Sequence, residues 1–288
     1  MSEDPNSAFY LYGFTQAGLP AEALGAAPFE ASGLPTESAS IATLAGVGIG
    51  GVDPSFWCHA GLAAIVSRVA RDEFCGPVAE SNLQDLAWVS PRALRHQAVL
   101  ERVMAVAPIL PARFGTLFSS LDAISQLMQR QRESIADFLS RTACHEEWAV
   151  KGLLDRAQAE AGLWSQKQAG KERPQISAPG LAYLLEQQAR RKAKEELEEV
   201  LAVACSTLLD ELTTLASEAC SRPVRSPETT GGELQMISNW AFLVPRLAAA
   251  PFQEQVEQAN VKQSLPGLTF AVSGPWPPYS FCPALSLE

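Results

Sequence analysis

The sequence has few of the residues and motifs on which common catalytic and metal-binding sites depend. It contains only 3 histidines among 288 residues. Its 6 cysteines are widely spaced and include no Cys-x-x-Cys pair, so neither a zinc ribbon nor a disulfide framework is expected. Neither a G-x-S-x-G nor a Walker A motif occurs, which argues against the usual α/β-hydrolase elbow and P-loop. We therefore predict a protein that is not an enzyme and that holds no metal or cofactor.

The sequence also lacks an apolar run long enough to cross a bilayer. The uncharged run 38–52 is too short and too rich in glycine to span a membrane. Basic residues are outnumbered, 22 Lys and Arg against 32 Asp and Glu, so the electrostatic footprint of a nucleic-acid binder is missing. Residues 1–5 contain neither a basic nor an apolar signal region, and this predicts a cytoplasmic protein.

Apolar residues, by contrast, are plentiful, at 47% of the chain, which is enough for a packed core. In the first half, apolar patterning predicts strands over 8–14, 41–49, 62–69 and 109–115, a helix that begins at Ser90-Pro91, and a single helix over 121–139. In the second half it predicts strands over 148–153, 222–228, 234–244 and 268–272, with helices over 181–216 and 252–261.

The order of these elements predicts an α+β protein of two domains. Strand, helix, strand, strand, helix, strand in the second half is the order of a ferredoxin-like split βαβ unit. The first half is expected to be a related α/β sandwich with helices on a sheet. The expected boundaries are 1–143 for the first domain, 144–273 for the second and 274–288 for a C-terminal tail rich in proline and aromatic residues.

Two short motifs resemble functional signatures but lack the context that those signatures need. Gly46 to Gly51 satisfies G-x-G-x-x-G, yet residues 52–54 are Val-Asp-Pro, which favours a turn instead of the helix that a dinucleotide site requires. Residues 145–147 are His-Glu-Glu, but no second histidine follows at the spacing of a zinc protease. We interpret both as structural segments.

Cysteine and histidine could in principle combine into a metal site or a nucleophile pair. Cys58, His59, Cys75 and His96 are candidate ligands, but structural zinc sites use two close pairs of ligands, and adjacent residues rarely point at one centre. Buried thiols and a surface histidine are the expected alternative. A nucleophile pair of Cys144 or Cys58 with His96 has no supporting motif.

Two segments carry stronger signals of interaction. Residues 109–115 form a predicted edge strand, because a central strand would not tolerate Pro111, and Gly115 permits an unusual backbone angle after it. Residues 274–281 are extended by their prolines and present three aromatic rings, either as a clasp over their own domain or as a surface for a partner. The candidate protein-interaction or interdomain residues are Arg113, Phe114, Gly115, Trp276, Tyr279 and Phe281.

These segments also carry a resemblance to the GvpL/GvpF family of gas vesicle proteins. The matching positions are 10–13, 64–67, 91–93, His96, 99–100, 103–104, 110–116, 147–151, 239–244 and 274–281. Residues 110–116 resemble the family's Leu-Pro-x-Arg-Phe-Gly-Thr element, and the Pro-Trp-Pro-Pro-Tyr run at 275–279 is the most specific match, because it is improbable by chance. The sequence departs from the family pattern at Gln97, where glutamate is expected, and at Ala112, where a larger residue is common.

The resemblance implies a minor, non-enzymatic component of gas vesicles that is needed for their assembly. Its expected partners are the small hydrophobic shell protein and other accessory gas vesicle proteins, and its expected role is to limit aggregation of the shell protein during nucleation. A shell subunit would bind at an exposed apolar surface or sheet edge near residues 109–116. The alternative is a cytosolic ligand-binding sensor or enzyme on a ferredoxin-like scaffold, with a pocket near Cys58, His59 and His96.

Overall fold

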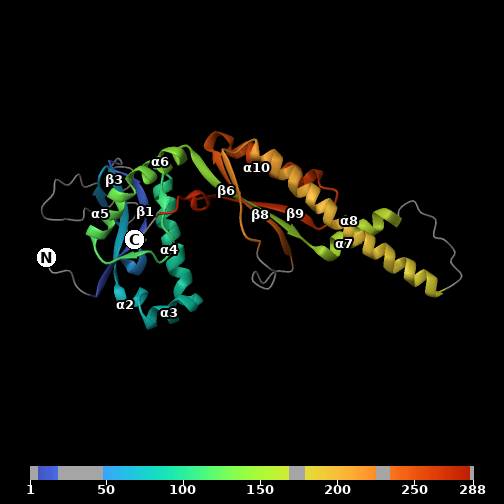
Figure 1. The fold of residues 1–288 in the computed structure, drawn as a ribbon, viewed down its shortest axis with the longest axis horizontal. Coiled ribbons are helices and arrows are strands. Elements are labelled where there is room, and N and C mark those ends of the chain that lie inside the picture. Colours follow the sequence, from blue (N-terminus) through green and yellow to red (C-terminus); the bar gives the residue numbers. More distant parts are fainter. Residues whose placement is uncertain (1–5, 19–47, 169–178, 225–233, 286–288) are drawn as a thin grey trace. The chain divides into compact units, whose positions relative to one another are not determined.

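The computed structural model describes residues 6–18, 48–168, 179–224 and 234–285 (Figure 1). Contacts divide the chain into a first unit, Met1–His145 with Trp276–Glu288, and a second unit, Glu146–Pro275. The last residues of the chain therefore pack within the first unit, although they follow the second unit in sequence. Each unit contains one sheet and its own helices, so the fold is α+β, and the strand pairs of defined register are antiparallel.

The first unit is built on a sheet of order β2-β3-β1-β4, with β5 also paired to β1. Its strands are β1 (Ser7–Gln16), β2 (Ser55–His59), β3 (Leu62–Ala70), β4 (Leu110–Pro111) and β5 (Leu117–Phe118). Its helices are η2 (Ile49–Gly51), α2 (Arg71–Phe74), α3 (Pro77–Gln84), α4 (Leu86–Met104), α5 (Leu121–Arg130), α6 (Arg132–Thr142) and η4 (Tyr279–Phe281). The predicted strands over 8–14 and 62–69 are confirmed as β1 and β3.

The central strand β1 places side chains on both faces of this sheet. Tyr10 and Tyr12 share a core cluster with residues of α4, among them Val99 and Val103. Helices α5 and α6 contact strands β2, β5, β1 and β4 of the same sheet. A β-bulge between Leu11 and Gly13 shifts the pairing with β3 by one residue. Because such a shift reverses side-chain alternation, the bulge redirects the second half of β1.

The second unit has a sheet of order β7-β8-β6-β9. Its strands are β6 (His145–Leu154), β7 (Glu218–Ser221), β8 (Gln235–Pro245) and β9 (Leu268–Trp276), and its helices are α7 (Arg156–Gln168), α8 (Pro179–Thr213), η3 (Arg246–Ala248) and α10 (Ala249–Lys262). Alternate residues of the strands, such as Trp240 and Phe242, form one core with Leu201 and Leu208 of α8 and Phe252 of α10. The apolar face of the sheet, formed by alternate strand residues, therefore packs against the apolar faces of the two helices.

The start of α4 differs from the prediction. The helix begins at Leu86, because the side chain of Asp85 accepts a hydrogen bond from the backbone N–H of Ala87 at 2.9 Å and caps it. Ser90 is therefore not the N-cap, and Pro91 lies inside the helix. A good cap five residues earlier outweighs the lost hydrogen bond at the proline.

Four other predicted elements need adjustment. Of the strand predicted over 109–115 only β4, Leu110–Pro111, forms. The single helix expected over 121–139 is wrong, because non-helical angles at Gln131 divide it into α5 and α6, which follow each other directly. Strand β7 ends at Ser221, and of the strand predicted over 222–228 the residues 225–228 lie outside the described part. The predicted strand over 41–49 falls mostly outside it too, and its end forms the turn η2.

Candidate functional site

A hydrogen-bonded chain of aromatic side chains joins the C-terminal segment, residues 276–285, to the core of the first unit. The Tyr10 hydroxyl lies 2.9 Å from Nδ1 of His96, and Nε2 of His96 lies 3.0 Å from the Tyr279 hydroxyl. We call Tyr10, His96 and Tyr279 the Tyr–His–Tyr network. His96 is buried in α4, its ring stacks on Tyr12 with centroids 5.6 Å apart, and 183 residues separate it from Tyr279.

Tyr10 bonds both the histidine and the backbone of the turn after β4. Its oxygen accepts a hydrogen bond from the backbone N–H of Gly115 at 3.1 Å. In the neutral imidazole one ring nitrogen donates and the other accepts, so the tautomer of His96 sets which partner donates in each of the two Tyr–His bonds. Burial lowers the pKa of His96 to about 4, against a smaller opposing effect of the Ala112 carbonyl, so the ring is neutral at neutral pH.

Tyr12 forms a second polar anchor beside this network. Its hydroxyl lies 3.0 Å from Oγ of Ser67 and accepts the backbone N–H of Ile49 at 2.8 Å. Burial raises the pKa of Tyr12 and raises that of Tyr10 well above its usual range, so both remain protonated donors. The turn at Ile49 is thereby held against the sheet, and no described helix follows it as a dinucleotide site would need.

The predicted site residues Arg113, Phe114 and Gly115 form a turn that follows β4. Gly115 has a φ of 83°, the left-handed conformation that glycine adopts without strain, as its identity predicted. The backbone N–H and the hydroxyl of Thr116 both donate to the Arg113 carbonyl, at 3.1 and 2.7 Å. The Phe114 ring packs edge-on against Tyr10 and His96. The turn therefore presents Phe114 to the network and leaves the Arg113 side chain exposed.

The C-terminal segment, residues 276–285, packs within the same unit. Trp276 ends β9 with 38% of its surface exposed, and Tyr279 is 37% exposed. Phe281 is buried, and its carbonyl accepts a hydrogen bond from the Arg141 guanidinium at 3.1 Å. The Cys282 thiol donates to the Pro278 carbonyl at 3.3 Å. Trp276 and Tyr279 are thus about equally exposed and Phe281 is buried, and Tyr279 is the residue that joins the network.

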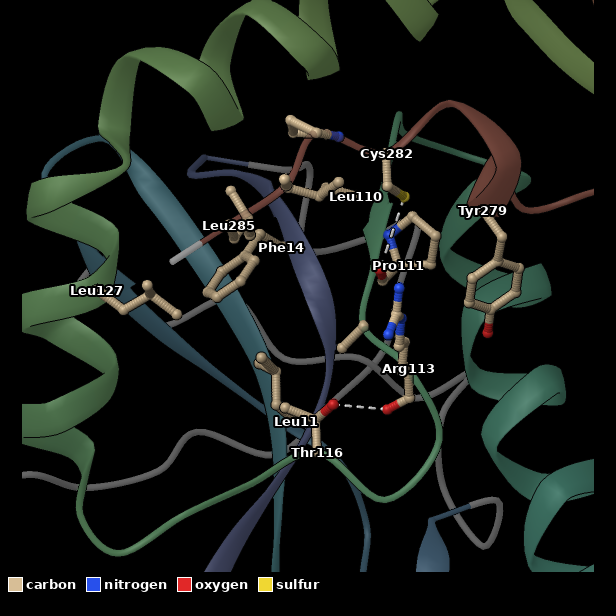
Figure 2. A pocket seen from close by; sticks show the side chains of 13 residues that line it. Leu11, Phe14, Leu110, Pro111, Arg113, Thr116, Leu127, Tyr279, Cys282 and Leu285 are labelled. Carbon is tan, nitrogen blue, oxygen red and sulfur yellow. Dashed lines mark hydrogen bonds between the residues drawn. The ribbon is translucent and has the colours of Figure 1, made fainter. Parts of the chain in front are cut away.

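A cavity of about 500 Å³ opens between β4 and the C-terminal segment, and we call it the β4–tail pocket (Figure 2). Its walls come from β1, β4, the following turn, α5 and the C-terminal segment. The lining residues are Leu11, Phe14, Leu110, Pro111, Ala112, Arg113, Thr116, Leu127, Tyr279, Cys282, Pro283, Ala284 and Leu285. Leu11 and Phe14 both reach it because the bulge lies between them.

The cysteine and histidine candidates lie in several environments. Cys58 and Cys75 are exposed and His96 is buried, so the expectation of buried thiols and a surface histidine is wrong for these residues. His59 lines a separate shallow hollow with residues of α5. In the described ranges, no group of three or more histidine, cysteine or acidic side chains has an arrangement that could hold a metal.

The sequence did not predict that Leu11, Phe14 and Leu127 would line one cavity, or that His96 would bond Tyr279. Leu127 lies within the helix predicted over 121–139, but helical periodicity does not identify which segment the apolar face will meet. Tyr10 and His96 matched the family pattern in the sequence, but that match did not predict that the two side chains would bond each other. None of the helices in the part of the chain that the structure describes is long and apolar enough to span a bilayer.

Fold and site together define an α+β protein of antiparallel sheets whose C-terminal aromatic segment is bonded to a buried histidine. The chain belongs to the gas vesicle synthesis protein GvpL/GvpF family, whose family model matches residues 8–283. This membership supports an accessory role in gas vesicles, confirms the resemblance seen in the sequence, and suggests a protein that is not an enzyme.

Individual relatives agree with the family assignment. Gas vesicle protein L of Streptomyces sp. (strain CB03234) is 27% identical over 234 residues, which cover 81% of this chain and 85% of the relative. Gas vesicle protein L1 of Halobacterium salinarum is 26% identical over 257 residues, covering 86% of this chain and 87% of that protein.

Solved structures show the same fold. The crystal structure of the gas vesicle protein GvpF from Anabaena sp. PCC7120 matches with a TM-score of 0.63 at 20% identity, covering 96% of this chain and 97% of that one. GvpF from Microcystis aeruginosa matches with a TM-score of 0.61 at 18% identity, covering 96% and 99%.

Proposed function

We propose that this protein is a gas vesicle assembly factor that binds the hydrophobic shell protein and limits its aggregation during vesicle nucleation. It acts in the cytoplasm and at the growing vesicle, together with other accessory gas vesicle proteins, and it carries out no catalysis. Family membership supports the setting, and the observation that carries the binding role is the β4–tail pocket. An open apolar cavity is a surface that a hydrophobic client can fill.

The charge of the chain suits this role. Its net charge is −10, and like charges keep protein particles apart in solution. A complex with a hydrophobic client would keep this repulsion between complexes, because a client bound at the apolar pocket leaves the charged surface of the chain exposed. Of the candidate interaction residues, Arg113 and Tyr279 line the pocket, and Phe114 and Gly115 contact the network. Trp276 and Phe281 belong to the same C-terminal segment as Tyr279.

We further propose that the second unit is a ferredoxin-like domain. The support is its strand order: the first strand, β6, lies between β8 and β9, and β7 lies beyond β8. The two crossover segments contain helices α8 and α10, as a split βαβ unit requires. In this proposal the binding surface lies in the first unit, whose sheet has a different strand order and which includes the C-terminal segment.

Co-expression with the shell protein tests the proposed function. Because a hydrophobic client is expected to aggregate when produced alone, the two proteins are produced together and the affinity-tagged chain is purified from the supernatant. We expect the shell protein to remain in solution and to co-purify, and to sediment when the chain is absent. If the shell protein sediments equally in both cases, the proposed function is wrong. A reproducible rise in Tm with a nucleotide or a divalent metal would instead favour the ligand-binding alternative.

A further inference from the structure

The floor of the β4–tail pocket is apolar and comes from buried side chains. Leu11, Phe14 and Leu127 are 2%, 2% and 1% exposed, so they belong to the packed interior while also lining the cavity. Leu285 faces them from the C-terminal segment (Figure 2). The volume, about 500 Å³, lies inside the range of roughly 300 to 1,000 Å³ that is usual for ligand sites. Aliphatic or aromatic side chains would therefore be the natural occupants.

Arg113 gives this apolar pocket a defined charge. It is exposed and is the only charged residue among the described residues of the lining. Within the described ranges its guanidinium makes neither an ion pair nor a hydrogen bond, although its backbone carbonyl accepts two from Thr116. A guanidinium beside an apolar cavity is complementary to a carboxylate, which it can bind with two parallel hydrogen bonds.

The edge of the sheet at this place is unsuited to the addition of a strand. Strand β4 contains only Leu110 and Pro111, and proline has no N–H to donate. The Cys282 thiol also approaches the Pro111 carbonyl, at 3.9 Å, from the C-terminal segment. A partner would therefore be recognised here through its side chains and charge and not through a ladder of backbone hydrogen bonds.

We propose that the β4–tail pocket receives an apolar segment of the shell protein that carries a carboxylate, and that Arg113 pairs with this carboxylate. The apolar side chains of the segment fill the space above Leu11, Phe14 and Leu127, while the carboxylate stays at the exposed rim. Apolar contact supplies affinity, and the arginine specifies which segment of a hydrophobic client is bound and in which direction. This inference rests on the proposed function and names the site and the chemistry of the contact.

The test compares variants of the full chain co-expressed with the shell protein. Arg113→Gln removes the charge, Arg113→Lys retains it without the planar fork, and Ala284→Trp fills the pocket from an exposed position of the C-terminal segment. The matched controls are Arg71→Gln, which removes a charge from exposed α2, and Ala136→Trp, which adds the same bulk on exposed α6. Thermal unfolding of each variant checks that it folds, and mass spectrometry measures shell protein per purified chain.

We expect Arg113→Gln and Ala284→Trp each to lower the amount of bound shell protein roughly tenfold, with Arg113→Lys intermediate and both controls unchanged. Added salt should weaken binding to the wild type more than binding to Arg113→Gln. If the wild type retains the shell protein and the pocket variants retain as much as the controls, the pocket inference is wrong and the proposed function stands. If even the wild type retains none, both are wrong.

Discussion

Lowering the pH from about 7 to about 4 is expected to destabilise the first unit through His96. The pKa of His96 is about 4 in the folded chain, against 6.5 for an unperturbed histidine. The unfolded state therefore binds a proton at a pH where the folded state does not. The stabilisation is fully present above the unfolded pKa and is lost progressively as the pH falls from about 6.5 to about 4.

The size of the effect follows from the difference in pKa. Each unit of pKa difference is worth about 1.4 kcal/mol, so the loss is about 2 kcal/mol by pH 5 and about 3 kcal/mol by pH 4. Such a loss is a substantial part of the stability of an ordinary domain. It also involves the C-terminal segment, because the neutral ring that bonds Tyr10 and Tyr279 has one donor and one acceptor, whereas a protonated ring donates from both nitrogens.

Urea unfolding at a series of pH values measures this dependence. Carboxylates that titrate in the same range contribute to the wild type and to His96→Gln alike, so the difference between the two isolates the contribution of His96. The variant is expected to be less stable at neutral pH but to show a shallower loss on acidification. Hydrogen exchange of peptides from α4 and β8 assigns the change to the first or the second unit. His59→Gln replaces a histidine outside the network and is the matched control for the substitution itself. Equal slopes for His96→Gln and the wild type would refute the reasoning.

Three further substitutions test other parts of the structure. Gly13→Ala should destabilise the first unit by about 1–3 kcal/mol, as measured by urea unfolding, because a Cβ there would lie 2.5 Å from the carbonyl oxygen of Leu110. Tyr279→Phe removes the bond to His96 and should cost about 1 kcal/mol, with faster amide exchange over 276–285. Arg222→Met removes the cation 2.9 Å from buried Glu147 and should lower the stability of the second unit by about 3 kcal/mol in urea unfolding.

Each of these three has an outcome that would contradict it. Wild-type stability of Gly13→Ala would mean that β4 can move away at little cost, and unchanged exchange in Tyr279→Phe would mean that other contacts hold the C-terminal segment. For Arg222 the control is Arg191→Met, which breaks an exposed pair with Glu195 and should cost no more than about 0.5 kcal/mol. Equal effects of the two arginine variants would exclude burial as the reason.

Local patterns predicted much of the secondary structure because they act over a few residues. The aromatic run of β1, the apolar run of β3 and the long helix that became α8 each bury a face whose period is readable from sequence. The left-handed turn at Gly115 followed from the lack of a side chain. Helix boundaries were less predictable, because the cap at Asp85 and the break at Gln131 depend on single side chains and backbone angles.

The sequence by itself determined the α+β class, the acidic charge, the lack of common catalytic motifs and the resemblance that the family match confirms. Only the tertiary structure decided that Tyr279 meets His96 across 183 residues, and that Leu11 and Phe14 share a pocket with Arg113 and Leu285. The reason is that a bulge, a crossover and the return of the chain end are properties of pairing between distant segments. Periodicity within one segment carries no information about which segment it will meet.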